Sequence, residues 1–412
     1  MVEMTNRSEA VPGENERFEE LGRGCYAYSA DGCSNTGVVI GEKGVLIVDG
    51  QATPALAEKV LQKVRELTDK PIKQVVLTHF HADNTLGAQA FEPGEMIASD
   101  LTKRMMEMRG VEEIRVARER DTALFAGLPG NAGVSTPSMT IASSMSIDLG
   151  GLDVRLMHLG RAHTMGDLVV WVPQSGVIFA GDLVQKAAVP YCGDAHLADW
   201  PRALDRITAF RPTALMPGRG KSAVGAQAVA TAVETTRDFV VTLRDAAAAC
   251  VEQSLGLKDT FQAVREALAG RFGSKADFEF HLPIGVARAY DEALGLDQPQ
   301  VWTRERISDL YDALGATVAA AEAAQEQSED VVATTETSPK EAPAASGEAE
   351  AADLVSDSDF AASLALGPED ELLEGGEEVD LSAEDIIDDD EQSDTPDTPE
   401  KAAADKVLED AR

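Results

Sequence analysis

Two histidines and an aspartate follow one another at two-residue spacing in the segment VVLTHFHADN. His79, His81 and Asp83 come directly after a short apolar run of β-branched residues, which predicts a buried strand that ends there. Side chains two residues apart on extended backbone point the same way, so all three can project into one cavity. Two imidazoles and a carboxylate form a ligand set that suits a borderline metal such as zinc. For this segment alone, a pair of surface histidines without a metal is the alternative.

Two later strand ends carry further candidate ligands. His163 stands in the loop GRAHTMGD, between two apolar runs that predict strands. Asp182 follows directly after a third apolar run, in VIFAGD. Ligands that are gathered from separate strand ends give a rigid site with an open face, which a catalytic metal needs. The three strand ends together therefore favour a metal site over surface histidines.

The segments between these residues predict the elements that position them. Strands are expected at CYAYSA, NTGVVIG and GVLIVDG, followed by a helix over 54–67 and the strand KQVVLT. A long helical stretch is expected over 100–128, and a second run of strands over 144–182. Helices near 199–209 and from about 224 complete the pattern. Sheets covered by helices, an α+β arrangement, are therefore expected in one domain over 18–245.

The ends of the chain differ from this domain in composition. Residues 1–17 are expected to be a flexible N-terminus, and 246–318 predict a helical extension, a candidate cap or homo-oligomerisation element. Residues 319–412 contain 30 acidic and 4 basic residues, a net of −26 out of −36 for the whole chain. With one aromatic residue, Phe360, this segment has too few apolar side chains to offset its ordering entropy. It is expected to be a disordered acidic tail.

Composition also narrows the partners and the compartment. The chain opens without an apolar signal region and has no apolar run of ~18 residues, so a cytoplasmic protein is expected. The four scattered cysteines are expected to be reduced, although Cys25 and Cys33 flank a turn and could face each other across a hairpin. The acidic balance argues against nucleic acid and anionic membrane as partners. The expected partner is a small-molecule substrate.

The segments THFHADN, GRAHTMGD and FAGD, in this order and spacing, resemble the signature of the metallo-β-lactamase superfamily. The resemblance covers about residues 20–220. It implies a four-layer αβ/βα sandwich with a metal site at one edge, between the two sheets. It also implies roles for single residues: a first metal held by His79, His81 and His163, a second metal held by Asp83, a bridge between the metals at Asp182, and a structural aspartate at Asp49.

This chain departs from the family pattern at two positions. Many hydrolases of the family have a histidine where this chain has Asn84, and another in a PGHG turn that is MPGRG here, with Arg219. Arginine stays protonated in proteins and cannot be a ligand. We therefore expect one tightly held zinc and an empty or weakly occupied second site. Arg219 is expected to pair with Asp83 or to bind an anionic substrate group. Asn84 and His196, the latter in a loop that often lines the family's pocket, are further substrate-binding candidates.

These features predict a metal-dependent hydrolase. A zinc ion with three imidazoles and one open position lowers the pKa of bound water to roughly 7, so a zinc-bound hydroxide can attack the substrate. Carbonyl-type substrates are expected, namely lactams, lactones, esters or thioesters. Asp83 is expected to act in catalysis by orienting that water or accepting its proton.

Two other interpretations stay open. The first is a mononuclear iron dioxygenase that acts on persulfides, as in other members of the superfamily, with His79, His163 and Asp182 holding the iron. The second is a non-catalytic binding protein with a degenerate site. A nucleic-acid-processing enzyme is disfavoured because the chain has no Lys/Arg-rich segment.

Overall fold

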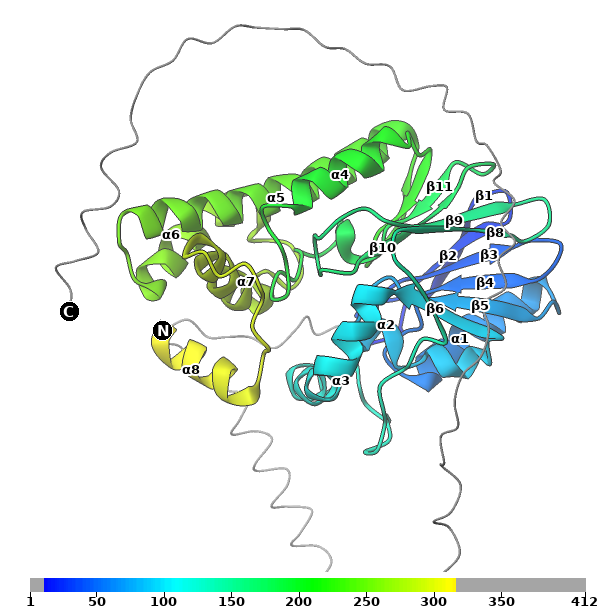
Figure 1. Ribbon diagram of the computed structural model, residues 1–412, viewed down its shortest axis with the longest axis horizontal. Helices are drawn as coiled ribbons and strands as arrows, with labels where there is room; N and C mark the ends of the chain where they lie inside the picture. The colour runs from blue at the N-terminus through cyan, green and yellow to red at the C-terminus, as the bar shows by residue number, and fades with distance from the viewer. Residues whose placement is uncertain (1–10, 316–412) are drawn as a thin grey trace, which may run out of the picture. The chain divides into compact units, whose positions relative to one another are not determined.

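The computed structural model describes residues 11–315 (Figure 1). The first sheet contains seven strands, which lie in chain order across it. The strands are β1 (Arg17–Gly22), β2 (Cys25–Ser29), β3 (Thr36–Ile40), β4 (Val45–Val48), β5 (Ile72–Val76), β6 (Glu95–Ser99) and β7 (Met139–Ile141). Neighbours are antiparallel from β1 to β4 and parallel from β4 to β7.

The second sheet contains six strands in the order β13-β12-β11-β10-β9-β8. They are β8 (Ser144–Asp148), β9 (Asp153–His158), β10 (Leu168–Val172), β11 (Val177–Phe179), β12 (Ala214–Met216) and β13 (Ala223–Val224). The pairs from β8 to β11 are antiparallel, and β11 runs parallel to β12. Both sheets are thus mixed.

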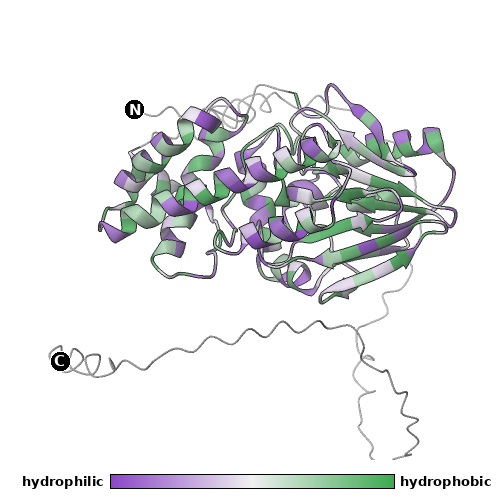
Figure 2. Ribbon diagram, turned by 90° about the horizontal axis from the view of Figure 1, so that it is seen from above, coloured by the Kyte–Doolittle hydropathy of each residue, from purple (hydrophilic) through white to green (hydrophobic). Residues whose placement is uncertain are grey.

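Alternating apolar side chains place the two sheets face to face. Leu46 and Val48 of β4 belong to the apolar core between the sheets, whereas Val45 and Ile47 face the opposite way, toward helices. The central strands of both sheets are nearly continuous apolar runs because both of their faces are buried. In Figure 2 these strands are mostly green, while the helices carry both green and purple.

Helices cover the outer face of each sheet. On the first sheet lie α1 (Pro54–Leu67) and α3 (Asp100–Arg120), and on the second α4 (Trp200–Ala209) and α5 (Ala226–Glu252). The helix over 54–67 begins where the sequence predicts, because Thr53 caps it through the Leu56 amide and Pro54 fits its first turn. These layers confirm the expected αβ/βα sandwich.

The C-terminal part of the described chain is helical, as expected. It consists of the end of α5, then α6 (Leu257–Phe272), α7 (Phe278–Ala293) and α8 (Arg304–Leu314). These helices share one apolar core with the outer face of the second sheet. Because α5 continues through residue 245, the domain boundary there stays a prediction. No helix within 11–315 has the length and apolarity to cross a membrane. The segment 319–412 lies outside the described residues.

Two local expectations were wrong. The helix expected over 100–128 ends at Arg120, because Asp121 leaves the helical conformation (φ −137°, ψ 68°). Cys25 and Cys33 do not face each other: the first lies in the core between the sheets and the second in the core under α1 and α3. All four cysteines are buried thiols.

Candidate metal centre

The candidate ligands lie in three loops at one edge of the sandwich: His79 and His81 after β5, His163 between β9 and β10, and Asp182 after β11. The loop after β5 is joined directly to the second sheet. The amide of Leu168, the first residue of β10, donates a hydrogen bond to the Thr78 carbonyl at 2.8 Å. The two sheets therefore fix these loops relative to each other.

The three histidine side chains surround one point. Their ring centroids are 4.8–4.9 Å apart, and the rings stand nearly perpendicular to one another at 77–86°. One nitrogen from each ring lies within 4.8 Å of the other two. His79, His81 and His163 are all buried, so the cluster is shielded from bulk water. This is the three-imidazole set that the family resemblance of the sequence implies.

Hydrogen bonds behind two of the rings determine which nitrogen faces inward. His81 Nε2 lies 3.1 Å from Asp194 Oδ2, and Arg109 holds the other oxygen of that carboxylate at 3.1 Å. His163 Nδ1 lies 3.0 Å from the Tyr191 carbonyl oxygen, which only accepts. Such partners fix the tautomer of a metal-binding histidine. They leave His81 Nδ1 and His163 Nε2 as the inward-facing atoms.

These two inward nitrogens face each other at 3.0 Å. With the outer nitrogens donating to Asp194 and to the Tyr191 carbonyl, the inward atoms of two neutral imidazoles both present lone pairs, which a metal ion or a proton on His81 would bring together. A tetrahedral zinc with Zn–N bonds of 2.0–2.1 Å would place two ligand nitrogens about 3.3 Å apart. The donor set and its spacing therefore fit a zinc-type metal held by His79, His81 and His163.

His79 is oriented by the residue before it. Thr78 Oγ1 lies 2.8 Å from His79 Nδ1 and 2.9 Å from Asp49 Oδ2. Asp49 also accepts the Thr78 amide at 2.8 Å, and it occupies a left-handed conformation (φ 65°) at the end of β4. Burial raises the pKa of Asp49 to about 8. Asp49 thus supports the loop and does not face the metal position.

The pKa values of the three imidazoles diverge. Burial, with the charges of neighbouring histidines, lowers the pKa of His79 and of His163 well below the ordinary value. Burial also lowers that of His81, but the hydrogen bond to Asp194 and the nearby carboxylates outweigh it and raise the pKa to about 9. In the metal-free chain a proton on His81 would therefore lie between it and His163, where a bound metal ion would replace it.

Asp182 lies beside the histidines because the backbone opposite it is a glycine. Its Oδ2 is 3.8 Å from His163 Nε2, and its Oδ1 is buried without a hydrogen-bond partner. A Cβ on Gly218 would fall 1.9 Å from that Oδ1. Burial raises the pKa of Asp182, although the charge of Arg219 opposes this rise. A buried carboxylate oxygen with no protein partner suits a metal ligand.

Arg219 lies beside Asp83 and Asp182, the two carboxylates of the site. Its Nη2 donates to Asp83 Oδ2, and the charges of Asp83 and Asp182 raise the pKa of Arg219 despite its burial. The Asn84 amide lies on the other side, with Nδ2 3.2 Å from His79 Nε2. An arginine that stays charged therefore lies where a second metal would need Asp83 and Asp182 as ligands.

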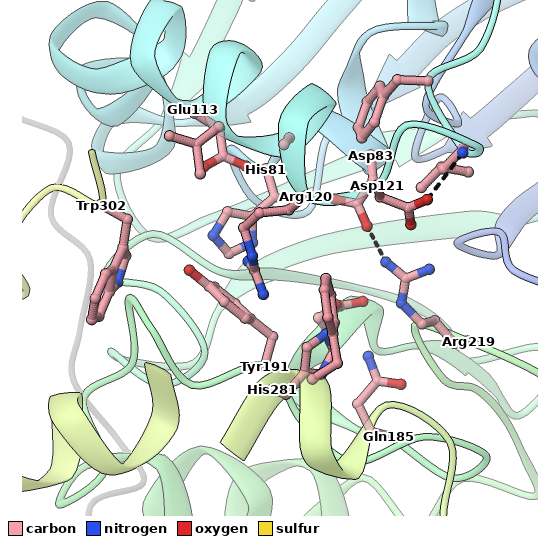
Figure 3. A pocket seen from close by; sticks show the side chains of 16 residues that line it. His81, Asp83, Glu113, Arg120, Asp121, Gln185, Tyr191, Arg219, His281 and Trp302 are labelled. Atoms are coloured by element: carbon pink, nitrogen blue, oxygen red, sulfur yellow. Dashed lines mark hydrogen bonds and ion pairs between the residues drawn. The ribbon is translucent and has the colours of Figure 1, made fainter. Parts of the chain in front are cut away.

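A cavity of about 80 Å³ opens beside the histidines (Figure 3). Its wall includes His81, Asp83, Asp182 and Arg219 from the sandwich, with Glu113 and Arg120 from α3. The helical extension contributes Phe280, His281 and Trp302. The extension therefore completes the wall of the cavity.

Of the other histidines, His281 lines the cavity, whereas His158 and His196 do not. His196 is buried near Asp297, 4.0 Å away, and does not line this cavity, so its substrate-binding role stays a prediction. His158 contacts the Asp167 carbonyl at 2.9 Å on β9. Cys192 donates to the Pro190 carbonyl at 3.7 Å. His281 reaches the cavity because α7 packs against the loop that carries Val189, whose carbonyl it contacts at 3.2 Å.

Sequence reasoning missed several residues of the site: Arg109, Glu113, Arg120, Tyr191, Asp194, Phe280 and Trp302. Asp194 and Tyr191 belong to the loop after Asp182, whose composition gave no signal for either of them. The α3 residues share one helix, with Glu113 and Arg120 seven positions apart, so two helical turns bring them to the same face. This helical spacing is the one signal in the sequence that could have pointed to any of these residues.

Comparison with known proteins identifies the fold family. The model of the metallo-beta-lactamase superfamily matches residues 31–219. A linear primary-alkylsulfatase from Pseudomonas sp. is 26% identical over 235 residues, which are 49% of this chain and 44% of the relative. A metallo-beta-lactamase type 2 from Bacillus sp. is 25% identical over 200 residues, 47% of this chain and 70% of the relative. The chain thus spans less than half of the alkylsulfatase.

Among solved structures, a metallo-beta-lactamase from Pontibacter korlensis is 21% identical, with a TM-score of 0.43. The alignment covers 55% of this chain and 99% of that one. Residues 31–219, which contain all three histidines and Asp182, are therefore similar to the metallo-beta-lactamase superfamily.

Proposed function

We propose that this chain is a metal-dependent hydrolase that holds one zinc ion with His79, His81 and His163. The observation that carries the proposal is the cluster of three buried imidazoles, each of which offers a nitrogen within 4.8 Å of the other two. The proposed substrates are carbonyl-type: lactams, lactones, esters or thioesters. The relatives named as metallo-beta-lactamases and as an alkylsulfatase support hydrolysis as the reaction class.

Other residues of the chain would assist the metal ion in the reaction. A zinc ion held by three imidazoles supplies a nucleophile at neutral pH, because it lowers the pKa of its water to about 7. Asp83 lines the cavity and is held in place by Arg219, so it is positioned to accept a proton from a reacting water. The mostly buried wall around it limits competing water.

Metal analysis with matched variants tests the proposal. We expect about one zinc per chain in the purified protein, and a loss of more than about 100-fold in zinc affinity for His163→Ala, since loss even of a supporting partner costs 10–100-fold. Asn84→Ala should lose less than about tenfold, because an amide beside His79 is not a ligand. Equal losses in a competition titration with a chelator would contradict the assignment.

A substrate panel tests the reaction. It contains a chromogenic lactam, a lactone, an aryl ester and a thioester, with an alkyl sulfate added because one relative is named an alkylsulfatase. We expect hydrolysis of at least one carbonyl-type member, and its loss on metal removal and in His163→Ala. Iron in the purified protein, with oxygen uptake on glutathione persulfide, would favour the dioxygenase instead. Absence of any bound metal would contradict both the hydrolase and the dioxygenase.

A further inference from the structure

Arg120, the last residue of α3, lies against two aromatic rings. Its guanidinium carbon lies 4.5 Å from the centroid of the Phe280 ring and 5.4 Å from that of Tyr191. Its Nε and Nη2 atoms are buried and have no hydrogen-bond acceptor, and it forms no ion pair with any residue from 11 to 315. Buried charged donors without acceptors are costly. A cation at a helix C-terminus is favourable, but this does not explain why the donors are buried.

Arg219 adds a second unsatisfied donor close by. Its Nη2 is taken by Asp83, whereas its Nη1 is buried without an acceptor. Both arginines line the cavity beside the metal centre (Figure 3). The structure thus places three buried guanidinium nitrogens without acceptors around one cavity.

A second and larger cavity begins at the same two arginines. It has a volume of about 680 Å³, and Arg120, Asp121 and Arg219 belong to the walls of both cavities. A volume of this size is typical of a small-molecule site. Most of its remaining wall is made of small apolar residues, among them Ala30, Ala123, Ala126, Ala187, Ala188 and Ala276. This second cavity, the alanine cavity, is suited to an apolar chain.

Several carboxylates around the junction have partners within the protein, whereas Asp182 Oδ1 is buried without one. Asp83 accepts from Arg219, Asp121 from the Leu124 amide, and Asp31 from Asn15. Glu113, on the far side of the first cavity, accepts from the Ala82 amide at 3.3 Å. None of these carboxylates forms an ion pair with Arg120 among the described residues, where its guanidinium contacts the rings of Phe280 and Tyr191.

We propose that Arg120 and Arg219 bind an anionic oxygen group of the substrate, a carboxylate, sulfate or phosphate, at the junction of the two cavities. The alanine cavity takes the apolar chain of the same molecule. Guanidinium groups bind such anions through paired, charge-assisted hydrogen bonds. The assignment of this molecule as substrate rests on the proposed hydrolase function, because its scissile bond would lie at the histidines. The anion site itself needs no metal.

Calorimetric titration of the full-length chain with eight-carbon probes tests the anion site. The probes are octanoate, octyl sulfate, octyl phosphate and the neutral octanamide. We expect at least one anion to bind at least tenfold more tightly than octanamide, with an affinity that falls as sodium chloride is raised. The ranking of the three anions identifies the head group. Equal affinities of octanamide and every anion would overturn the proposal.

Matched variants locate the site. Arg120→Gln should weaken binding of the preferred anion at least tenfold and leave octanamide unchanged. Arg104→Gln is the control, because Arg104 is an exposed arginine on the same helix and loses the same charge. Unchanged anion binding in Arg120→Gln, with folding verified by circular dichroism, would place the anion elsewhere and contradict the proposal. Equal losses in both variants would show a non-specific effect of charge and also contradict it.

Titrations before and after dialysis against a chelator separate this site from the metal. We expect the preference for an anion over octanamide to persist in the metal-free protein. If the preference disappears with the metal, the anion binds the metal and the Arg120 site is refuted. Failure of the hydrolase proposal would appear in the elemental analysis, not in these titrations, so the two failures are distinguishable.

A series of carboxylates tests the alanine cavity. From butyrate to hexanoate to octanoate, affinity should rise by about fourfold per methylene group if the chain is buried. Ala123 lies exposed at the rim of this cavity, so Ala123→Trp should fill it without disturbing the core. We expect this variant to lose the gain with chain length but to keep the affinity for butyrate. A series without any gain in the wild type would refute the apolar half of the proposal.

Discussion

At the scale of single residues, we propose that the charge of Arg219 limits how many metals the site can hold. The arginine is paired with Asp83 and lies close enough to Asp182 for both carboxylates to raise its pKa. A second divalent cation would need the same two carboxylates and would be repelled by the guanidinium. The arginine thus supplies a fixed positive charge beside Asp83 and Asp182.

Replacing this arginine should create a better second site. Arg219→His removes the positive charge and adds a neutral imidazole, so both changes favour a second metal. We expect elemental analysis at a fixed excess of zinc to rise from about one toward two metals per chain. Arg219→Lys is the matched control, because it keeps the charge without adding a ligand, and it should stay at one. Two tightly bound metals in the wild type would refute this account.

His196 should make the folded chain sensitive to acid. Both of its ring nitrogens are buried without hydrogen-bond partners, and burial, with the charges of Arg161 and Arg288, lowers its pKa from 6.5 to about 4. Between these values the unfolded chain binds a proton that the folded chain does not, so stability falls as the pH falls. Above pH 6.5 His196 costs the folded chain almost no stability. The cost grows as the pH falls below 6.5 and is complete near pH 4.

The variant His196→Leu isolates this contribution. Leucine cannot be protonated, so between pH 7.5 and pH 5 the variant should lose about 2 kcal/mol less unfolding free energy than the wild type. Urea unfolding at the two pH values measures the difference, and all other titrating groups cancel in the comparison. Equal pH dependence of the two proteins would show that His196 titrates normally in the fold.

At the scale of elements, the sequence predicted strand ends better than it predicted what surrounds them. His79, His81 and His163 could be grouped because each follows or precedes a clear apolar run, and strand ends on packed sheets lie together. Asp194 and Tyr191 lie in a loop without periodicity, and only the folded loop brings them behind the histidines. The local sequence pattern therefore identified the candidate ligands, but not the residues that hydrogen-bond to them.

The same limit applies to helices. The segment over 54–67 has its cap, its proline and its apolar spacing within itself, so the sequence placed α1 correctly. The helix expected over 100–128 ended at Arg120, because nothing in the apolar spacing marks Asp121 as the point where the backbone turns. The early end places Arg120 at the junction of the two cavities.

The turn after β12 gives a prediction at this scale. A methyl group on Gly218 would lie 1.9 Å from Asp182 Oδ1, which no real contact allows, so Gly218→Ala must displace Asp182 or the turn. We expect a lower thermal midpoint and at least about tenfold weaker zinc binding. Gly133→Ala adds the same methyl group with no atom within 4 Å and should change neither quantity. A destabilised Gly218→Ala protein with unchanged zinc affinity would show that Asp182 does not contribute to zinc binding.

At the scale of the whole molecule, the sandwich and the C-terminal helices depend on each other. Buried residues of α6 and α7, such as Val264, Leu268 and Leu282, share one core with the outer face of the second sheet. The same helices provide Phe280 and, through the segment after α7, Trp302 to the cavity beside the histidines. The composition predicted that 246–318 are helical. Their contribution to the site depends on tertiary packing, which no local pattern encodes.

Two truncations test this dependence. A chain that ends after residue 245 loses α6, α7, α8 and the end of α5, and it exposes the core that they cover. Burial of one large apolar side chain contributes about 1.5–3 kcal/mol, whereas a whole domain is stable by about 5–15 kcal/mol. Losing several such residues should abolish cooperative unfolding, and a well-folded 1–245 fragment would show that the sandwich is independent.

A chain that ends after residue 318 keeps every described element, and the removed segment is poor in core-forming residues. We expect its thermal midpoint and zinc content to equal those of the full chain, because it keeps the apolar core and the three candidate histidine ligands.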